Sequence, residues 1–414
     1  MAALLQASNA TVTRERDEMH YLDHAATTPM RAEALEVFQA AAAQFGNPSS
    51  LHRIGQAAKA RLEGARALIA DTLGAESVEL ILTSGGTESL NMAIKGQFWA
   101  RGPERNVIIV PEGEHHAVLD TVEWLERHDG AQLIWVPLQR DGRINQAAWQ
   151  EALAEYGDRV ALAVCIWVNN ETGTVQPLPA LADTAAGHDV PLHVDAVAAY
   201  GHEVIDFSQL LQLNPHVSVS VSAHKIGGPQ GIGALLLGRG TTLESLIHGG
   251  GQQRKLRAGT ENVLATEAFA AAAQAMSERF AGERADRIRL RDRIRESVFG
   301  IPDARVNGSP EYASDAIVHA TFAGCESDSL LFLLDTAGVE VSTGSACQAG
   351  VTEISHVVLA LGYSEDEARG SLRFSLGHSS TDADVDALIA ALPDAVDRAR
   401  AAGRAARSTR FDER

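Results

Sequence analysis

The stretch from Val217 to Gly231 constrains this chain more than any other part of its sequence. Valine alternates with serine through Val221, which is the period of a strand with two unlike faces. The alternation stops at Ser222, and a turn rich in glycine and proline follows Lys225. Lys225 is therefore predicted to lie at the end of a strand, where α/β proteins place their chemistry. A lysine there either solvates the edge of the sheet or, once desolvated, loses its proton and reacts with a carbonyl group.

Composition narrows the classes of protein that the chain fits. Its 414 residues favour two domains, and a hydrophobic content of 45% is enough for a large core. The formal net charge of −19 argues against nucleic acid as a direct partner, because phosphate binding needs a basic surface. No stretch reaches the length of a membrane span, so no membrane partner is expected. Three cysteines make no disulfide framework, so we expect a reducing, cytoplasmic location. Residues 1–19 lack the apolar core of a secretory signal, so we expect them to be a disordered leader.

Apolar strands and helical segments alternate along the first two thirds of the chain. This order predicts a mostly parallel sheet with helices on both faces. A long helix at about 262–298 is expected to lead into a smaller α+β domain, and residues 401–414 are expected to be a frayed tail. The predicted strands of the sheet lie at about 79–84, 106–110, 132–136, 159–168, 191–196, 217–221 and 233–237.

Polar residues beside these elements admit both structural and functional interpretations. Gly86 and Thr87 open a helix whose unpaired amides suit a phosphate, or Thr87 only caps that helix. His115 follows the next strand, where it either stacks on a planar ring or caps a helix. Asn47 reaches a ligand or only shapes the turn before Pro48.

The glycine-rich loop at 248–260 is basic although the protein is acidic. It is either a flexible linker or an anion contact made by Arg254, Arg257 and Thr260. Ten short motifs, each weak alone, occur in order between Tyr21 and Leu392. They are YLDHAATTP (21–29), FGNPSS (45–50), TSGGTES (83–89), EHHAV (114–118), VNNETG (168–173), HVDA (193–196), SAHKIGGPQG (222–231), the loop 248–260, STGSAC (342–347) and RFSLG (373–377).

In this order the motifs resemble the cysteine desulfurases of the class V aminotransferase family, in particular the group I housekeeping enzymes of iron–sulfur cluster assembly. The resemblance implies pyridoxal 5′-phosphate as cofactor and the aspartate aminotransferase-like α/β fold, fold type I. It implies a large domain (31–274) with a mostly parallel seven-stranded sheet and a small α+β domain (20–30 and 275–400) that carries the Cys347 loop. It also implies a homodimer that converts L-cysteine to L-alanine and a persulfide on Cys347. The sulfur would pass to an iron–sulfur scaffold, to tRNA thiolation or to another acceptor protein.

The resemblance also assigns roles to single residues. Lys225 binds the cofactor and moves the substrate proton, Cys347 receives the sulfur, and His115 stacks on the cofactor ring and helps to move protons. The cofactor-binding residues are Gly86, Thr87, His115, Asn170, Asp195, Ser222, His224, Lys225 and Thr260, the last from the partner subunit. The substrate-binding residues are Asn47, Asn170 and Arg373. No permanent metal site is implied, although Cys347 can bridge transiently to a cluster held by a scaffold.

The residues around the three cysteines support this assignment. Small residues surround Cys347, as is typical of a mobile, exposed loop that carries a nucleophile. Cys165 lies in an apolar run and Cys325 beside an acidic residue, so we interpret both as structural.

One position departs from the family, because Ala198 stands where a glutamine usually bonds the cofactor's phenolic oxygen. This change predicts slightly weaker cofactor binding but not lost activity. The alternatives that remain open are a selenocysteine lyase, another pyridoxal-phosphate lyase without a persulfide, and a non-catalytic sulfur-relay scaffold.

Overall fold

The computed structural model describes residues 19–344, 347–348, 351–352 and 354–412, and for 347–348, 351–352 and 404–412 it describes the backbone alone. Seven strands form a central sheet in the order β2-β8-β7-β6-β5-β3-β4. Strand β8 runs antiparallel to both neighbours, and the other four pairings are parallel. The predicted mostly parallel seven-stranded sheet is therefore confirmed. Its strands are β2 (Leu80–Thr83), β3 (Val107–Pro111), β4 (Gln132–Val136), β5 (Val160–Ile166), β6 (Leu192–Asp195), β7 (Ser218–Ser222) and β8 (Gly233–Leu237).

Both faces of this sheet are covered by helices, which explains why most of its strands are continuous apolar runs. In β3, Val107 and Ile109 belong to the core on one face, whereas Ile108 and Val110 belong to the core on the other. Helices α4 and α5 supply the second of these cores, and α3, α6, α7 and α8 contribute to the first. The helices of this part are α2 (Ala32–Ala42), α3 (Arg53–Asp71), α4 (Gly86–Arg101), α5 (His116–Asp129), α6 (Gln146–Tyr156), α7 (Leu178–Gly187) and α8 (Phe207–Leu213).

Strand β7 has the two unlike faces that its sequence predicts. Its valines lie in the core of the first face. On the other face, the hydroxyls of Ser218 and Ser220 lie 2.8 and 3.1 Å from the two ring nitrogens of His193. Every residue of β7 is buried, so its faces differ in chemistry and not in exposure. The strand leads directly into the 3-10 turn η3 (Ala223–Ile226), which carries Lys225.

A second core lies in the C-terminal part of the chain and gives the smaller α+β unit that the sequence predicts. Its sheet is antiparallel, in the order β14-β10-β9, and α10 and α13 pack against it. Leu22 joins this core, because β1 pairs with β11. The elements are β1 (His20–Tyr21), β9 (Ala304–Asn307), β10 (Ile317–Phe322), α10 (Ser327–Thr336), β11 (Val339–Glu340), β12 (Cys347–Gln348), β13 (Val351–Thr352), α11 (His356–Ala360), α12 (Glu365–Ala368), β14 (Ser371–Ser375) and α13 (Asp382–Asp412). The residue boundaries of the two domains stay a prediction.

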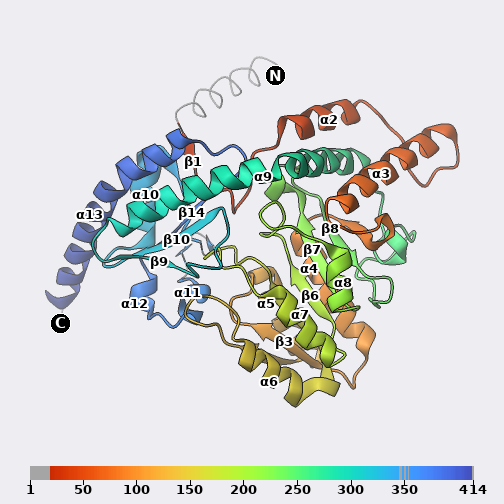
Figure 1. Cartoon of the computed structure of the whole chain (residues 1–414), viewed down its shortest axis with the longest axis horizontal. Coiled ribbons are helices and arrows are strands. Elements are labelled where there is room, and N and C mark those ends of the chain that lie inside the picture. Colours follow the sequence, from red (N-terminus) through yellow and green to blue (C-terminus); the bar gives the residue numbers. More distant parts are fainter. Residues whose placement is uncertain (1–18, 345–346, 349–350, 353, 413–414) are drawn as a thin grey trace.

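Helix α9 (Val263–Phe299) connects the two cores. Its N-terminal half, with Phe269 and Met276, packs in the core of the central sheet, and its C-terminal half, with Leu290 and Ile294, packs in the second core. Figure 1 shows this helix running from the side of α13 to the side of α2 and α3. The middle of α9 therefore lies at the junction of the two parts.

The two ends of the chain differ in what the structure describes. The predicted leader, residues 1–19, lies outside the described residues except for Met19. Helix α13 continues to Asp412, through most of the stretch expected to fray, since this stretch is rich in alanine and arginine, which favour helix. No helix in the described part of the chain is both long and apolar enough to cross a membrane.

Candidate active site

A pocket of about 410 Å³ opens at the carboxyl ends of the parallel strands. Part of its wall comes from the second unit, with Ser342, Gly344 and Arg373, and part from the N-terminal segment, with Ala25 and Ala26. The topology thus brings together polar residues from strand ends far apart in the sequence. The pocket is lined by nine of the predicted site residues, which are Gly86, Thr87, His115, Asn170, Asp195, Ser222, His224, Lys225 and Arg373.

Lys225 enters the pocket from η3, directly after β7. Its Nζ donates hydrogen bonds to the backbone carbonyls of Ala26, at 2.9 Å, and Ala25. Burial and, next, the positive charge of Arg373 lower the pKa of Lys225 to about 8, while the charges of Asp23 and Asp195 oppose this fall. Roughly half of the amine is then neutral at about pH 8, so it is available as a nucleophile or as a base.

Asp195 is the last residue of β6 and is almost fully buried. Its Oδ1 accepts a hydrogen bond from the Val197 N–H at 2.9 Å. Burial raises the pKa of Asp195 to about 6, while the Val197 N–H and the Lys225 charge oppose this rise. The side chain is therefore an anion at neutral pH and can pair with a cationic group in the pocket.

His115 caps a helix, as one interpretation of its sequence position predicts, and it also lines the pocket. It is the N-cap of α5, and its Nδ1 accepts a hydrogen bond from the Ala117 N–H at 3.0 Å. Its side chain also lines the pocket, where burial and then the Lys225 charge lower the pKa of His115 to about 4. The ring is therefore neutral at pH 7, and because Nδ1 is an acceptor, the proton is assigned to Nε2.

His224 is likewise neutral. Its Nδ1 lies 3.1 Å from the hydroxyl of Thr27, and burial followed by the Lys225 charge lowers the pKa of His224 to about 4. The imidazole can therefore offer a hydrogen bond to a pocket ligand without adding a second full positive charge beside Lys225.

Arg373 projects from β14 with a buried guanidinium. Its Nη2 donates to the Asp23 carboxylate at 2.7 Å, and its Nη1 donates to the backbone carbonyl of Asn170 at 2.9 Å. Its Nε has no hydrogen-bond partner among the described residues. These two contacts fix the plane of the guanidinium at the pocket wall, as recognition of a carboxylate requires.

The start of α4 has the form of an anion site. Its N-cap is Gly85, so the interpretation of Thr87 as the N-cap is wrong, and Thr87 is the second helical residue. At Gly86 an added Cβ would lie only 2.7 Å from Val197 Cγ2, so a side chain there would collide with the pocket wall. The first amides of an α-helix have no helical partners and can bind a phosphate.

Together these groups fit pyridoxal 5′-phosphate. Gly86 and Thr87 with Ser222 and His224 would hold the phosphate. Asp195 would pair with the pyridine nitrogen, and Lys225 would supply the amine. The ring would lie beside His115. The charges of the pocket match those of the cofactor, with donors and a positive helix end for its phosphate and a buried carboxylate for its cationic nitrogen.

Two predicted site residues, Asn47 and Thr260, are not among the described residues that line this pocket. Asn47 is exposed, and its Oδ1 accepts a hydrogen bond from the Ser49 N–H at 2.9 Å, which shapes the turn around Pro48. The turn interpretation of Asn47 is therefore confirmed, and within one chain the residue does not reach the pocket. Thr260 is exposed on the loop at 248–260.

The arginines of that loop have partners within the chain. Arg257 pairs with the Glu88 carboxylate at 2.8 Å, and Arg254 donates to the Val78 carbonyl at 3.1 Å. Both guanidinium groups thus have partners within the chain, and these contacts stabilise the position of the loop.

The structure describes the backbone of Cys347 but not its side chain. Its backbone begins β12, which pairs with β13 as a short antiparallel hairpin. Gly344, three residues earlier, lines the pocket. Three residues span at most about 11 Å, so the backbone of Cys347 lies within that distance of the pocket wall at Gly344.

Several residues of the pocket were missed in the sequence analysis. The carbonyls of Ala25 and Ala26 are backbone groups, which leave no trace in a sequence pattern. His356 lines the pocket, and its Nε2 lies 3.0 Å from the Glu114 carbonyl; its position soon after the Cys347 motif was the available signal. Among the described residues, no cluster of His, Cys, Asp and Glu is arranged to hold a metal ion.

Glu114 lies behind the pocket and is completely buried. Its Oε1 accepts a hydrogen bond from the Ile166 N–H at 2.7 Å, and its Oε2 has no partner among the described residues. Burial raises the pKa of Glu114 well above its usual range, and the negative charge of Asp195 adds to this rise. The carboxyl group therefore holds its proton more tightly in the folded protein than in the unfolded chain.

Replacing Glu114 by glutamine is expected to increase stability at alkaline pH. Because the folded carboxyl holds its proton more tightly than the unfolded one, wild-type stability falls as the pH rises above about 4.3, the unfolded pKa. Glutamine keeps the acceptor for the Ile166 N–H and does not titrate. Urea unfolding of both proteins should give matching free energies near about pH 4 and a difference in favour of Glu114→Gln near about pH 8. Equal differences at both pH values would mean that Glu114 is ionised in the fold.

Comparison with known proteins identifies the family. The family model for class-V aminotransferases matches residues 20–388. An IscS-like cysteine desulfurase of Mycobacterium tuberculosis is 49% identical over 396 residues, covering 94% of this chain and 99% of that protein. Among solved structures, a NifS-like protein superposes with a TM-score of 0.84 at 28% identity, covering 92% of this chain and 99% of that one. SspA in complex with cysteine superposes with a TM-score of 0.75 at 32% identity, covering 87% of this chain and all of the other.

These matches confirm the fold-type-I architecture and the family that the motifs indicate. By sequence over nearly its whole length, the chain belongs to the class-V aminotransferase family and, within it, to the IscS-like cysteine desulfurases, whose cofactor is pyridoxal 5′-phosphate.

Proposed function

We propose that this cysteine desulfurase takes L-cysteine into the Lys225 pocket and transfers its sulfur to Cys347. In this reaction L-cysteine and the Cys347 thiol are converted to L-alanine and a Cys347 persulfide, so that all atoms balance. The observation that carries the proposal is the meeting of Lys225, Asp195 and Arg373 in one pocket. They are an amine of lowered pKa, a buried anion and a fixed guanidinium, as a cofactor-assisted reaction at the Cα of an amino acid requires.

Lys225 is proposed to hold the cofactor and then to carry the substrate proton. When bound, pyridoxal phosphate withdraws electrons from the Cα–H bond of an amino acid joined to it. The Lys225 amine, partly neutral near pH 8, accepts that proton and returns it when alanine is formed. Asp195 is mostly ionised above about pH 6, so it would keep a negative charge available to the ring nitrogen of the bound cofactor.

Arg373 is proposed to orient the substrate L-cysteine. Its guanidinium is held by Asp23 and the Asn170 carbonyl, and it would bind the carboxylate of L-cysteine. His115 is neutral at pH 7, but its Nδ1 already accepts the Ala117 N–H. It can take the proton of the substrate thiol only by releasing that hydrogen bond, or by exchanging protons through Nε2.

Sulfur transfer needs the Cys347 thiolate at the pocket. The thiolate attacks the substrate sulfur, the Cβ–S bond breaks, and its electron pair stays with the carbon skeleton that becomes alanine. The pocket-lining Gly344 sits close enough in sequence for the Cys347 hairpin to reach this place. The names of the IscS relatives support delivery of the sulfur to iron–sulfur cluster assembly, and we propose an acceptor protein of that pathway or of tRNA thiolation as partner.

A homodimer and a cytoplasmic location complete the proposal. Thr260 and Asn47 are exposed in the single chain, and a second subunit would allow Thr260 to reach the phosphate of its partner. Cys165 and Cys325 are buried thiols outside any disulfide, which suits a reducing compartment.

The proposed reaction is tested with purified protein, radiolabelled L-cysteine and no acceptor. One labelled sulfur should be retained per active site, released by cyanide and mapped to the Cys347 peptide, with an equal amount of L-alanine formed. Alanine without retained sulfur would favour a lyase that forms no persulfide. A far higher rate with L-selenocysteine would favour selenium chemistry, and absence of the cofactor's absorbance would favour a scaffold.

Replacing Ala198 by glutamine is expected to tighten cofactor binding. Ala198 lines the pocket and is half-buried, so the longer side chain has room to enter. One added hydrogen bond of about 0.5–1.5 kcal/mol lowers the Kd of pyridoxal phosphate by a factor of about 2 to 10. Fluorescence titration of the apoprotein measures this, with Ala198→Leu as a control of similar bulk. An unchanged or raised Kd for Ala198→Gln would contradict the expectation.

A further inference from the structure

Arg31 binds the backbone of the turn that carries Lys225. Its side chain is buried, with 3% exposed, and its Nε donates to the Ile226 carbonyl at 2.8 Å. Its backbone N–H donates to the Gly227 carbonyl, also at 2.8 Å. Both carbonyls that follow Lys225 are thus held by one residue. Gly227 has a positive φ of 82°, and an added Cβ there would lie 2.7 Å from Arg31 Cγ, so the turn and the arginine fit tightly.

The segment that ends in Arg31 also holds the other side of the lysine. The Lys225 amine donates to the carbonyls of Ala25 and Ala26. The Thr28 N–H donates to the His224 carbonyl at 3.2 Å. The acceptors of the amine and the support of its backbone therefore belong to one short segment, and a shift of Arg31 relative to the turn would change both.

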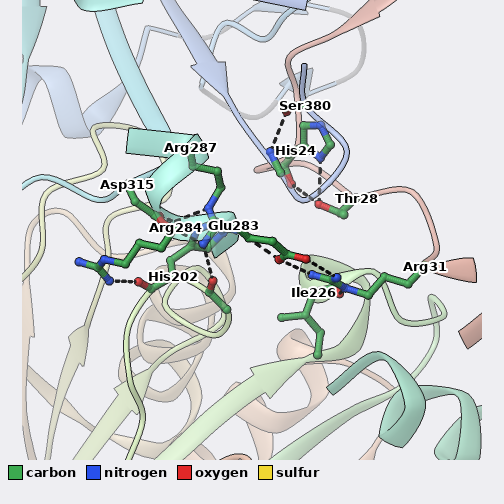
Figure 2. A network of polar contacts seen from close by, with 12 residues as sticks. His24, Thr28, Arg31, His202, Ile226, Glu283, Arg284, Arg287, Asp315 and Ser380 are labelled. Carbon is green, nitrogen blue, oxygen red and sulfur yellow. Dashed lines mark hydrogen bonds and ion pairs between the residues drawn. The ribbon is translucent and has the colours of Figure 1, made fainter. Parts of the chain in front are cut away.

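Glu283 orients the Arg31 guanidinium. The two groups form a bidentate pair with both N···O distances at 2.7 Å, and Glu283 stands in the middle of α9, between the halves that belong to the two cores. Arg287, one turn further on, lies 3.5 Å from Glu283 and donates to the fully buried Asp315 at 2.8 Å. Figure 2 shows Arg31 and Glu283 facing each other beside Ile226, with Arg287 reaching Asp315.

We propose that Arg31, oriented by Glu283, is a positioning residue that holds the Lys225 amine in the pocket wall, an inference that rests on the proposed function of Lys225. Arg31 is buried and Glu283 is partly exposed, so the carboxylate pairs with a guanidinium that has little contact with water. The pair ties the turn of Lys225 to α9, which packs in both cores.

The position of the amine decides its ionisation. In the pocket wall it is desolvated and near a positive charge, and both conditions lower the pKa of Lys225. A looser turn would let the amine move toward water and away from these neighbours, so its pKa would return toward the ordinary value. The charged and titratable groups that face it are Asp23, His115, Asp195, His224 and Arg373.

Competitive acetylation of the apoprotein tests this without any turnover. Each lysine is labelled with isotopic acetic anhydride over a range of pH and quantified by peptide mass spectrometry, with Lys95 as internal reference. We expect the midpoint for Lys225 to rise by at least about half a pH unit in Arg31→Lys and Arg31→Ala, and in the milder Glu283→Gln. In the loaded enzymes kcat should fall while the KM for L-cysteine changes little.

Arg284→Ala is the matched control. Arg284 lies on α9 beside Glu283 and binds the His202 carbonyl and Glu203 at the same junction, but it does not touch the lysine turn. In Arg284→Ala, the pH midpoint of Lys225 acetylation should equal that of the wild type. An unmoved midpoint in Glu283→Gln and in any folded Arg31 variant would overturn the proposal, and so would an equal shift in Arg284→Ala. A protein without desulfurase activity that still shows the selective shift would contradict the proposed function alone.

Discussion

Replacing Lys225 by alanine is expected to lower the rate of L-alanine formation from L-cysteine by about 10³-fold or more. Lys225 is the only lysine among the described residues that line the pocket, and its amine is partly neutral near pH 8. A positioned general base contributes about 10²–10⁴-fold. Loss of the amine would also remove the proposed covalent attachment of the cofactor. Lys225→Arg should be equally inactive, because a guanidinium keeps the charge but does not give up its proton. The measurement is the steady-state rate with saturating pyridoxal phosphate.

Lys255→Ala is the control for this variant. Lys255 is exposed on the loop at 248–260 and is not among the described residues that line the pocket. Its replacement should leave the rate within about twofold, as is usual for a surface substitution. A Lys225→Ala protein that keeps more than about a tenth of the wild-type rate would show that another group removes the proton.

Replacing Cys347 by alanine is expected to abolish the persulfide and to lower sulfide release by about 10³-fold or more. The variant should keep the cofactor's absorbance, because Lys225 and Asp195 are untouched. The variant should still bind L-cysteine, so adding L-cysteine should still change the absorbance spectrum of the cofactor. Only the later transfer of sulfur should fail. The measurements are cyanide-released thiocyanate and the absorbance spectrum on the same sample.

Cys325→Ala is the matched control for the thiol. Cys325 is buried in the second core, and its Sγ lies 3.6 Å from the Val396 carbonyl. Its loss should reduce stability slightly and leave the amount of thiocyanate unchanged. Persulfide formation at the wild-type level in Cys347→Ala would show that the sulfur is received elsewhere.

Much of the fold follows from local patterns. The alternation in Val217–Ser222 predicts β7, and the run of apolar strands predicts the parallel sheet, because each strand buries both of its faces. Strand-end positions then place Asp195 and Lys225 at one edge of the sheet. What the pattern could not show is that the serine face of β7 is also buried, since this depends on His193 of the neighbouring strand.

The contacts that tune the site are long-range and therefore invisible in a local pattern. Lys225 is held by carbonyls 199 and 200 residues away in sequence, and Arg373 pairs with Asp23 over a separation of 350 residues. The contact between Arg31 and Glu283 is also long-range, because it depends on where α9 lies relative to the two cores. Sequence motifs supplied the reactive groups, whereas their orientation depends on how the two cores meet.

The central claim is that the lysine after β7 is the residue that carries the cofactor and the chemistry. Borohydride reduction of the purified holoenzyme, followed by digestion and mass spectrometry, tests it directly. The account predicts a pyridoxyl phosphate group on Lys225, with none on Lys59, Lys95 or Lys255 and no remaining activity. A reduced protein labelled on another lysine, or unlabelled while its cofactor is present in stoichiometric amount, would contradict the account.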